Sequence, residues 1–308
     1  MKIKAVFFAC LIAVVPALAL AQQDEDVRGA FMTTRPKPAP KGTKPVATNR
    51  PSHRRPKLVV PEGTKPVDPT PKTSEKLNTA RLGLGLTLFM RDSNGLSVRT
   101  DPTHQFRKGD HVRFLLETNT DGFLYVFNTT DGGQPIMIYP DPEVDEAGNY
   151  FQAHVPFEIP SSMATEERLR WFTFDDRAGA EKLYFVFTRE PLGAVPIEDD
   201  LITYCRDNDG KCPWRPADDT WAAIQKEMAE PIQIAKSDRM GSAQTAPEKQ
   251  AVSRGIGLNR DDPEPSLIML TASTSRNMLV AVVDLIHKSM SAVDTADEEG
   301  PVGEEYPK

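Results

Sequence analysis

The residues best suited to acid–base chemistry are the histidines, and they are scattered along the chain. The five are His53, His104, His111, His154 and His287. None has a second histidine four residues away, the spacing that places two imidazoles on one helix face for a metal. The sequence also lacks the local signatures G-x-S-x-G, S-x-x-K, H-E-x-x-H and the P-loop. We therefore expect a non-enzymatic protein with no catalytic residue, although distant positions can still converge into a triad.

Two acidic stretches contain residue types that calcium sites use. They are Asp207-Asn-Asp-Gly210 and the set Asp141, Glu143, Asp145 and Asn149. The first has Cys205 where a calcium loop carries an acidic residue and lacks the downstream Glu, and the second matches no complete ligand loop. Because Asp, Asn and Gly favour turns without any metal, we expect ordinary turns here, with no metal and no cofactor.

Cysteine chemistry is restricted to one pair. Cys10 lies in an apolar N-terminal run, which leaves Cys205 and Cys212 once that run is removed. In an oxidising compartment we expect them to form a disulfide that closes a small loop. Zinc is the alternative, but it requires two more soft ligands nearby, and no histidine lies between residues 155 and 286.

Two tryptophans beside this cysteine pair are the candidate partner contacts. Trp214 lies between Pro213 and the pair Arg215-Pro216, and Trp221 follows in the same segment. Aromatic residues on a braced loop are typical of contact patches. The alternative is that both tryptophans pack helices onto the rest of the fold.

The first 21 residues have the pattern of a secretory signal peptide. Lys2 and Lys4 precede an apolar run, and Ala19-Leu20-Ala21 precedes Gln22. This A-x-A pattern predicts cleavage after Ala21 and a periplasmic or secreted protein. The run is shorter than a spanning helix requires and contains Pro16, so we expect no stable membrane span after cleavage.

Residues 22–81 have the composition of a disordered, Pro/Lys-rich linker. They contain ten prolines, thirteen Lys or Arg and six Asp or Glu. Residues 82–308 carry 22 basic and 38 acidic residues, a net charge of −16. A cationic arm thus precedes an acidic body, and we expect solvation of both parts and electrostatic self-association rather than a specific anion-binding role. A folded part this acidic also argues against nucleic acid.

Alternating strands and turn signals in residues 82–192 predict an antiparallel β-sandwich. Leu82, Leu84, Leu86, Leu88 and Met90 recur at every second residue, as in a strand with one buried face. Further predicted strands are 112–117, 123–127, 136–139, 150–159, 169–174 and 183–188. Turns such as Asn94-Gly95 and Asp121-Gly122 separate them.

The chain after residue 192 is expected to interrupt and then complete this domain. Residues 193–253 contain two predicted helices, 197–204 and 219–228, the second with Asp218 or Asp219 as its N-cap. Strand character returns at 255–258, 266–271 and 278–287. We therefore expect a mainly β, Ig-like sandwich over residues 82–289 with a small helical insertion, followed by an acidic, disordered tail over 290–308.

Several of these motifs occur in the order found in a known family. They are Phe106-Arg-Lys-Gly-Asp-His-Val-Arg-Phe114, Thr118 to Asn128, Ile138-Tyr-Pro140, Phe172-Thr-Phe174, Gly179-Ala-Glu181 and Thr188-Arg-Glu-Pro-Leu192. In this pattern the chain resembles domain-of-unknown-function family 4384. The resemblance implies a β-sandwich module of bacterial envelope or signalling proteins, and it implies no activity or catalytic residue. Glu181 and Arg189, at the two ends of the strand 183–188, could pair with each other or with neighbours.

These observations favour an exported binding or interaction module of the bacterial envelope. The expected partner is an envelope protein or a cell-wall glycan, held by the loops or a sheet edge of the sandwich. A regulatory or accessory subunit of an envelope enzyme is the alternative, and a cryptic hydrolase is the third possibility.

Overall fold

The computed structural model describes residues 23–38, 53–55, 80–143, 145–208 and 212–288. The signal peptide with its cleavage after Ala21, most of the linker and the acidic tail lie outside these ranges, so the predictions made for them stay predictions. Among the described residues, no helix has the length and apolar character needed to cross a membrane.

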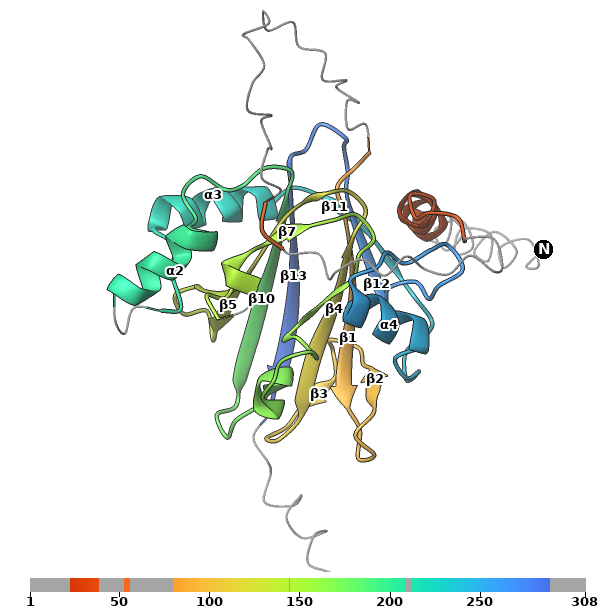
Figure 1. The fold of residues 1–308 in the computed structure, drawn as a ribbon, viewed down its shortest axis with the longest axis horizontal. Helices are drawn as coiled ribbons and strands as arrows, with labels where there is room; N and C mark the ends of the chain where they lie inside the picture. Colours follow the sequence, from red (N-terminus) through yellow and green to blue (C-terminus); the bar gives the residue numbers. More distant parts are fainter. Residues whose placement is uncertain (1–22, 39–52, 56–79, 144, 209–211, 289–308) are drawn as a thin grey trace, which may run out of the picture.

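Two β-sheets pack face to face and form a sandwich (Figure 1). The first sheet has the order β11-β12-β1-β4-β8, with β2 beside β1 and β9 beside β4. Its strands are β1 (Gly83–Arg91), β2 (Ser97–Arg99), β4 (His111–Thr118), β8 (Phe157–Ile159), β9 (Phe172–Thr173), β11 (Ile232–Lys236) and β12 (Leu267–Thr271).

The second sheet has the order β3-β13-β10-β5-β6, with β7 beside β5. Its strands are β3 (Gln105–Phe106), β5 (Gly122–Thr130), β6 (Ile136–Tyr139), β7 (Tyr150–Phe151), β10 (Gly179–Thr188) and β13 (Met278–His287). The pairings among the described strands are antiparallel, apart from the short parallel pair of β13 with β3. The prediction of a mainly β, two-sheet sandwich is confirmed.

The alternation in β1 explains how the core forms. Leu84, Leu86 and Leu88 point between the sheets and join the main hydrophobic cluster, as predicted. The intervening residues face outward but are also buried, because further layers cover the sheet. Gly85 leaves room for the ring of Pro265, which a Cβ at this position would overlap.

Helices cover the outer face of the second sheet. The predicted helices are present as α2 (Glu198–Asp207) and α3 (Asp218–Met228). They pack on outward-facing residues of β5, β10 and β13 and lie on the left in Figure 1. The predicted N-cap is wrong by one residue: Ala217 occupies that position, and Asp218 and Asp219 lie in the first turn, where their charges favour the helix dipole.

The outer face of the first sheet carries two elements that were not predicted from the sequence. Residues 23–32 form a helix, whose Val27 and Phe31 pack on Ile268 and Leu270 of β12. The second is α4 (Ala246–Arg254). Both lie on the right in Figure 1.

The prediction that residues 22–81 are disordered throughout is therefore wrong for 23–38, because an apolar pair four residues apart finds a sheet to cover. Residues 53–55 also rest on the body. His53 is buried between the rings of Phe151 and Phe157, and Arg54 forms ion pairs with Glu146 and Asp199.

Four other element predictions need correction. Residues 150–159 are not one strand, because β7 and β8 belong to different sheets, and residues 169–174 hold a 3-10 turn (Glu167–Arg170) followed by the short β9. Residues 193–253 are not only a helical insertion, since β11 extends the first sheet. Residues 255–258 form no strand, because Gly255 ends α4 in the left-handed conformation.

Candidate functional site

One side of the sandwich, which we call the open side, contains an apolar cavity. It lies where β6 ends the second sheet and β8 ends the first. The cavity measures about 510 Å³. Its apolar lining consists of Ile138, Phe157, Ile159, Met163, Leu169 and Phe172.

A second cavity of about 280 Å³ continues between the sheets. It shares Ile138 and Phe172 with the first cavity. Its deeper walls come from core residues of three strands, Val112, Phe114, Leu183 and Leu285. We call the two cavities together the open-side groove.

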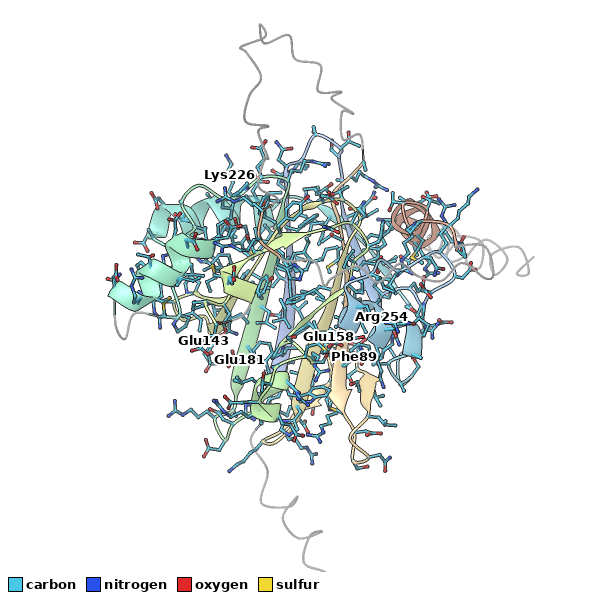
Figure 2. All side chains as sticks on the ribbon, in the orientation of Figure 1. Phe89, Glu143, Glu158, Glu181, Lys226 and Arg254 are labelled. Atoms are coloured by element: carbon cyan, nitrogen blue, oxygen red, sulfur yellow. A yellow bond between two sulfur atoms is a disulfide. The ribbon has the colours of Figure 1, made fainter. Side chains whose placement is uncertain are left out.

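Carboxylates surround this groove. They are Asp141, Glu143, Glu158, Glu166, Asp175 and Glu181, and Figure 2 labels Glu143, Glu158 and Glu181. The described residues that line the two cavities include no Lys or Arg. Burial raises the pKa of Asp141, with a smaller contribution from the charge of Glu143. Glu158 is paired with Arg113, which does not line the groove, so the other five carboxylates supply the negative charge that a low-dielectric cleft concentrates.

Glu181 is held by hydrogen bonds at the floor of the groove. One of its carboxylate oxygens accepts from the Asn128 amide at 2.8 Å and from the Thr130 hydroxyl at 2.9 Å. Arg189 instead donates to the carbonyl of Ala80 at 2.6 Å. Of the pairings considered from the sequence, Glu181 and Arg189 therefore bind neighbours rather than each other.

The rim of the groove exposes large apolar side chains. Met163 is 50% exposed and Leu169 is 42% exposed. Both belong to the segment that follows β8 and line the larger cavity. Exposed apolar residues at the edge of a concave site are typical of surfaces that bind another molecule.

The two tryptophans lie away from this groove. Trp221 packs edge-on against Phe127 and Tyr184, with ring centroids 5.6 and 4.9 Å apart. The carbonyl of Trp214 accepts a hydrogen bond from the Met137 amide on β6. These contacts join the helices to the second sheet, whereas the role of Trp214 and Trp221 in partner contact stays a prediction.

The predicted disulfide is present. Cys205 and Cys212 are bonded, with Cα atoms 5.5 Å apart. The bond connects the last turn of α2 to the segment that carries Trp214. It therefore braces the edge of the sheet on which Trp214 rests.

Two of the residues considered for calcium are engaged in a turn and in packing, whereas Asp209 and Gly210 lie outside the described residues. Asp141 accepts from the Glu143 amide at 2.8 Å, and the Asn149 side chain donates to the carbonyl of Leu124. Within the described ranges, no group of three or more His, Cys, Asp or Glu side chains is arranged to hold a metal ion.

One constellation could not be predicted from the sequence, because its members are far apart in the chain. Nδ1 of His154 lies 2.7 Å from Oε1 of Glu117, and Nε2 lies 2.9 Å from the Thr34 hydroxyl. In the neutral ring, Nδ1–H donates to Glu117 and Nε2 accepts from Thr34. This is the hydroxyl–imidazole–carboxylate order of a catalytic triad.

Other contacts indicate that this constellation fastens the N-terminal segment to the sandwich. Arg35 binds both oxygens of Glu117, at 2.8 and 2.6 Å, so the carboxylate is shared between this guanidinium and the imidazole of His154. The Thr34 hydroxyl also lies 2.6 Å from the carbonyl of Phe31, a second acceptor for its proton. We interpret Thr34, Arg35, Glu117 and His154 as a latch.

The fold and groove define a two-sheet β-sandwich domain with a cleft on its open side. Residues 105–191, from β3 to just beyond β10, match the family model described as domain of unknown function (DUF4384). The chain thus carries a DUF4384 domain, as its motifs predicted. Apart from Leu285 and His287, the lining of the groove comes from this domain. No curated protein and no solved structure matched the chain.

Proposed function

We propose that this protein is an exported, non-enzymatic binding module of the bacterial envelope. Its open-side groove holds a segment of an envelope protein that carries both apolar side chains and Lys or Arg. The observation that supports the proposal most directly is an apolar lining combined with carboxylates, with no Lys or Arg among the described residues that line the groove.

Each property of the groove favours one property of the partner. The apolar lining favours burial of aliphatic or aromatic side chains, which removes them from water. The carboxylates favour Lys or Arg, and complementary charge raises both association rate and selectivity. The larger cavity lies within the usual volume of ligand sites, about 300–1,000 Å³.

In-cell photo-crosslinking tests this proposal. A photoreactive amino acid at Met163 or Leu169 is expected to capture one dominant envelope protein. The same residue at Met228, 39% exposed on α3, is the matched control and should capture little. Equal capture at all three positions, or none at the groove, would contradict the proposal.

A charge change on the rim tests the chemistry of the bound segment. Met163→Lys places a positive charge beside a partner that we expect to be positive, so capture through Leu169 should fall. Met228→Lys is the control, because it makes the same change on α3. Unchanged capture with Met163→Lys would show that the segment is not cationic.

The identity of the captured protein separates the two interaction functions. An enzyme recovered at fixed stoichiometry would favour the accessory-subunit alternative. The cryptic-hydrolase alternative has its own test, because Thr34→Ala removes the only hydroxyl of the latch and must abolish any hydrolysis that depends on it. We expect Thr34→Ala to leave capture at Met163 unchanged.

A further inference from the structure

A second cleft, of opposite charge, lies on the other side of Glu158. It measures about 760 Å³ and is bounded by the turn between β1 and β2, the segment 162–171 and α4. Glu158 and Met163 line both this cleft and the open-side groove. We call it the basic cleft.

Basic residues outnumber acidic ones in its lining. The basic residues are Arg91, Arg113, Arg170, Lys249 and Arg254, and the acidic residues are Glu158 and Glu167. This reverses the balance of residues 82–308, which carry 22 basic and 38 acidic residues. The cleft is thus a local positive region on an acidic body.

Arg113 forms the buried wall of the cleft. It is 5% exposed, and its guanidinium lies 3.9 Å from the centre of the Trp171 ring. Burial lowers its pKa, Glu158 opposes that effect, and the charges of Arg170 and Arg91 add to it. Its ion pair with Glu158 is long, at 3.4 Å, and the other oxygen of that carboxylate accepts from Gln244 at 2.6 Å. Arg91 pairs with Glu167 at 3.3 Å, and Arg170 donates to the carbonyls of Ala164 and Thr165.

The exposed wall of the cleft is the solvent side of α4. Lys249 and Arg254 both line the cleft and are exposed, and in the described part of the chain neither forms an ion pair. Their charges are available to a ligand. Figure 2 shows Arg254 on the right of the molecule, near Glu158 and Phe89.

The remaining polar residues that line the cleft indicate which groups a ligand should carry besides its negative charge. It consists of Ser97, Ser162, Gln244, Gln250 and Ser253. Hydroxyl and amide groups both donate and accept hydrogen bonds, which suits a ligand with many hydroxyls. Guanidinium groups bind carboxylates and phosphates in a bidentate manner. We propose that the basic cleft binds an acidic carbohydrate, in a site separate from the groove of the proposed function.

Other polyanions fit this cleft less well. Single-stranded nucleic acid is held by aromatic rings on which bases stack. Among the described residues that line the cleft, Trp171 is the one aromatic residue, and Arg113 already lies against its ring. An anionic lipid would bring acyl chains, for which the lining offers only Met163, Trp171 and Ala246 as apolar contacts.

Calorimetric titration of the full chain with a trigalacturonate oligosaccharide at low salt tests the proposal. We expect binding that weakens as salt is added, and no binding of the neutral maltotriose. The double variant Lys249→Ala/Arg254→Ala should bind at least about tenfold more weakly, the loss expected for one charge-assisted hydrogen bond. Ser253→Glu should weaken binding in the same direction without removing a basic residue.

The matched control is Lys226→Ala/Arg215→Ala, which removes two exposed basic residues outside the cleft. Lys226 lies at the upper left of Figure 2, far from Arg254. Absence of trigalacturonate binding, equal binding of maltotriose, or an equal loss in this control would overturn the proposal. Binding only to vesicles of anionic phospholipid would overturn it in favour of a membrane surface.

Discussion

Single residues on the outer face of the first sheet show why buried charges occur in this fold. In β4, Val112, Phe114 and Leu116 point into the core, so Arg113 and Glu117 must point outward. Because α4 and the N-terminal segment cover that face, both charges lose water and require partners. Glu158 and Arg35 supply them.

Arg35→Ala should lower the free energy of unfolding by about 3–5 kcal/mol, because it leaves the buried carboxylate of Glu117 without its bidentate partner. The variant also removes the donors that bind the carbonyls of Asn259, Asp262 and Pro263. Urea unfolding measures the change. Arg168→Ala is the control, because it breaks an exposed pair with Glu166 and should change stability by less than about 1 kcal/mol.

Asp141→Asn should stabilise the protein at pH 7. Burial raises the pKa of the Asp141 carboxyl in the folded state, so ionisation of this group opposes folding as the pH rises through that pKa. The amide imitates the protonated carboxyl and can still accept from the Glu143 amide. The gain should vanish below about pH 4, where the Asp141 carboxyl is protonated in both the folded and the unfolded state. Thermal unfolding of both proteins across this range measures it, and a gain that persists at low pH contradicts the explanation.

Trp221→Ala should destabilise the protein by about 3 kcal/mol, because the ring packs on Phe127 and Tyr184. If this packing is its whole role, partner capture at Met163 should be unchanged in the folded variant. A loss of capture in a variant that remains folded at the assay temperature would establish Trp221 as a partner contact, as the sequence predicted.

Whole elements differ in how well the sequence predicts them. The alternating leucines of β1 and the continuous apolar runs of β5, β10 and β13 predict the sandwich, because each strand has enough apolar residues to bury at least one face in the core. The helix over 23–32 was not predicted because its apolar pair, Val27 and Phe31, packs on β12, which lies far away in the sequence. In β11, Ile232 and Ile234 are two residues apart, as expected for one face of a strand. The strand was nevertheless not predicted, because it is short and polar residues surround it.

The candidate site was less predictable than the fold. From the sequence we expected loops or a sheet edge to hold the partner, and this stays a prediction; the groove lies beside the edge strands β6 and β8. Ile138 and Phe172 meet there because β6 and β9 belong to opposing sheets, which is a result of topology rather than of spacing. The latch of Thr34, Arg35, Glu117 and His154 has the same origin.

Phe31→Ala should cost about 3–5 kcal/mol, because the ring is fully buried between the N-terminal helix and β12. The cost arises in a segment whose composition predicts disorder. Chemical denaturation measures it, with the exposed Lys37→Ala as the control. A change below about 0.5 kcal/mol would mean that the helix does not contribute to the stability of the body.

At the scale of the whole molecule, segments near the two ends of the described chain pack together. β1 pairs with both β4 and β12, and β13 pairs with β10 over ten residues. The N-terminal helix rests on β12, and Arg28 forms an ion pair with Glu264 at 3.0 Å. The N-terminal helix therefore depends on strands near the C-terminus.

A chain that ends after residue 265 should fail to form the N-terminal helix, because it lacks Ile268 and Leu270 as well as the β13 strand of the second sheet. Trypsin should then cleave after Arg28 in the shortened protein much faster than in the full chain, as mass spectrometry of timed digests would show. Equal protection of Arg28 in the two proteins would mean that the helix forms independently.

Because residues 23–38 pack on β12, they reach their folded position only after β12 has been synthesised. Residues 23–38 and the central strand β1 are both synthesised before β12, with which they pack or pair. Such non-local pairing delays their folding until β12 is available. If the chain is exported as we propose, its leading end passes through the translocation channel with nothing to fold against, so the chain stays unfolded until β12 and β13 emerge.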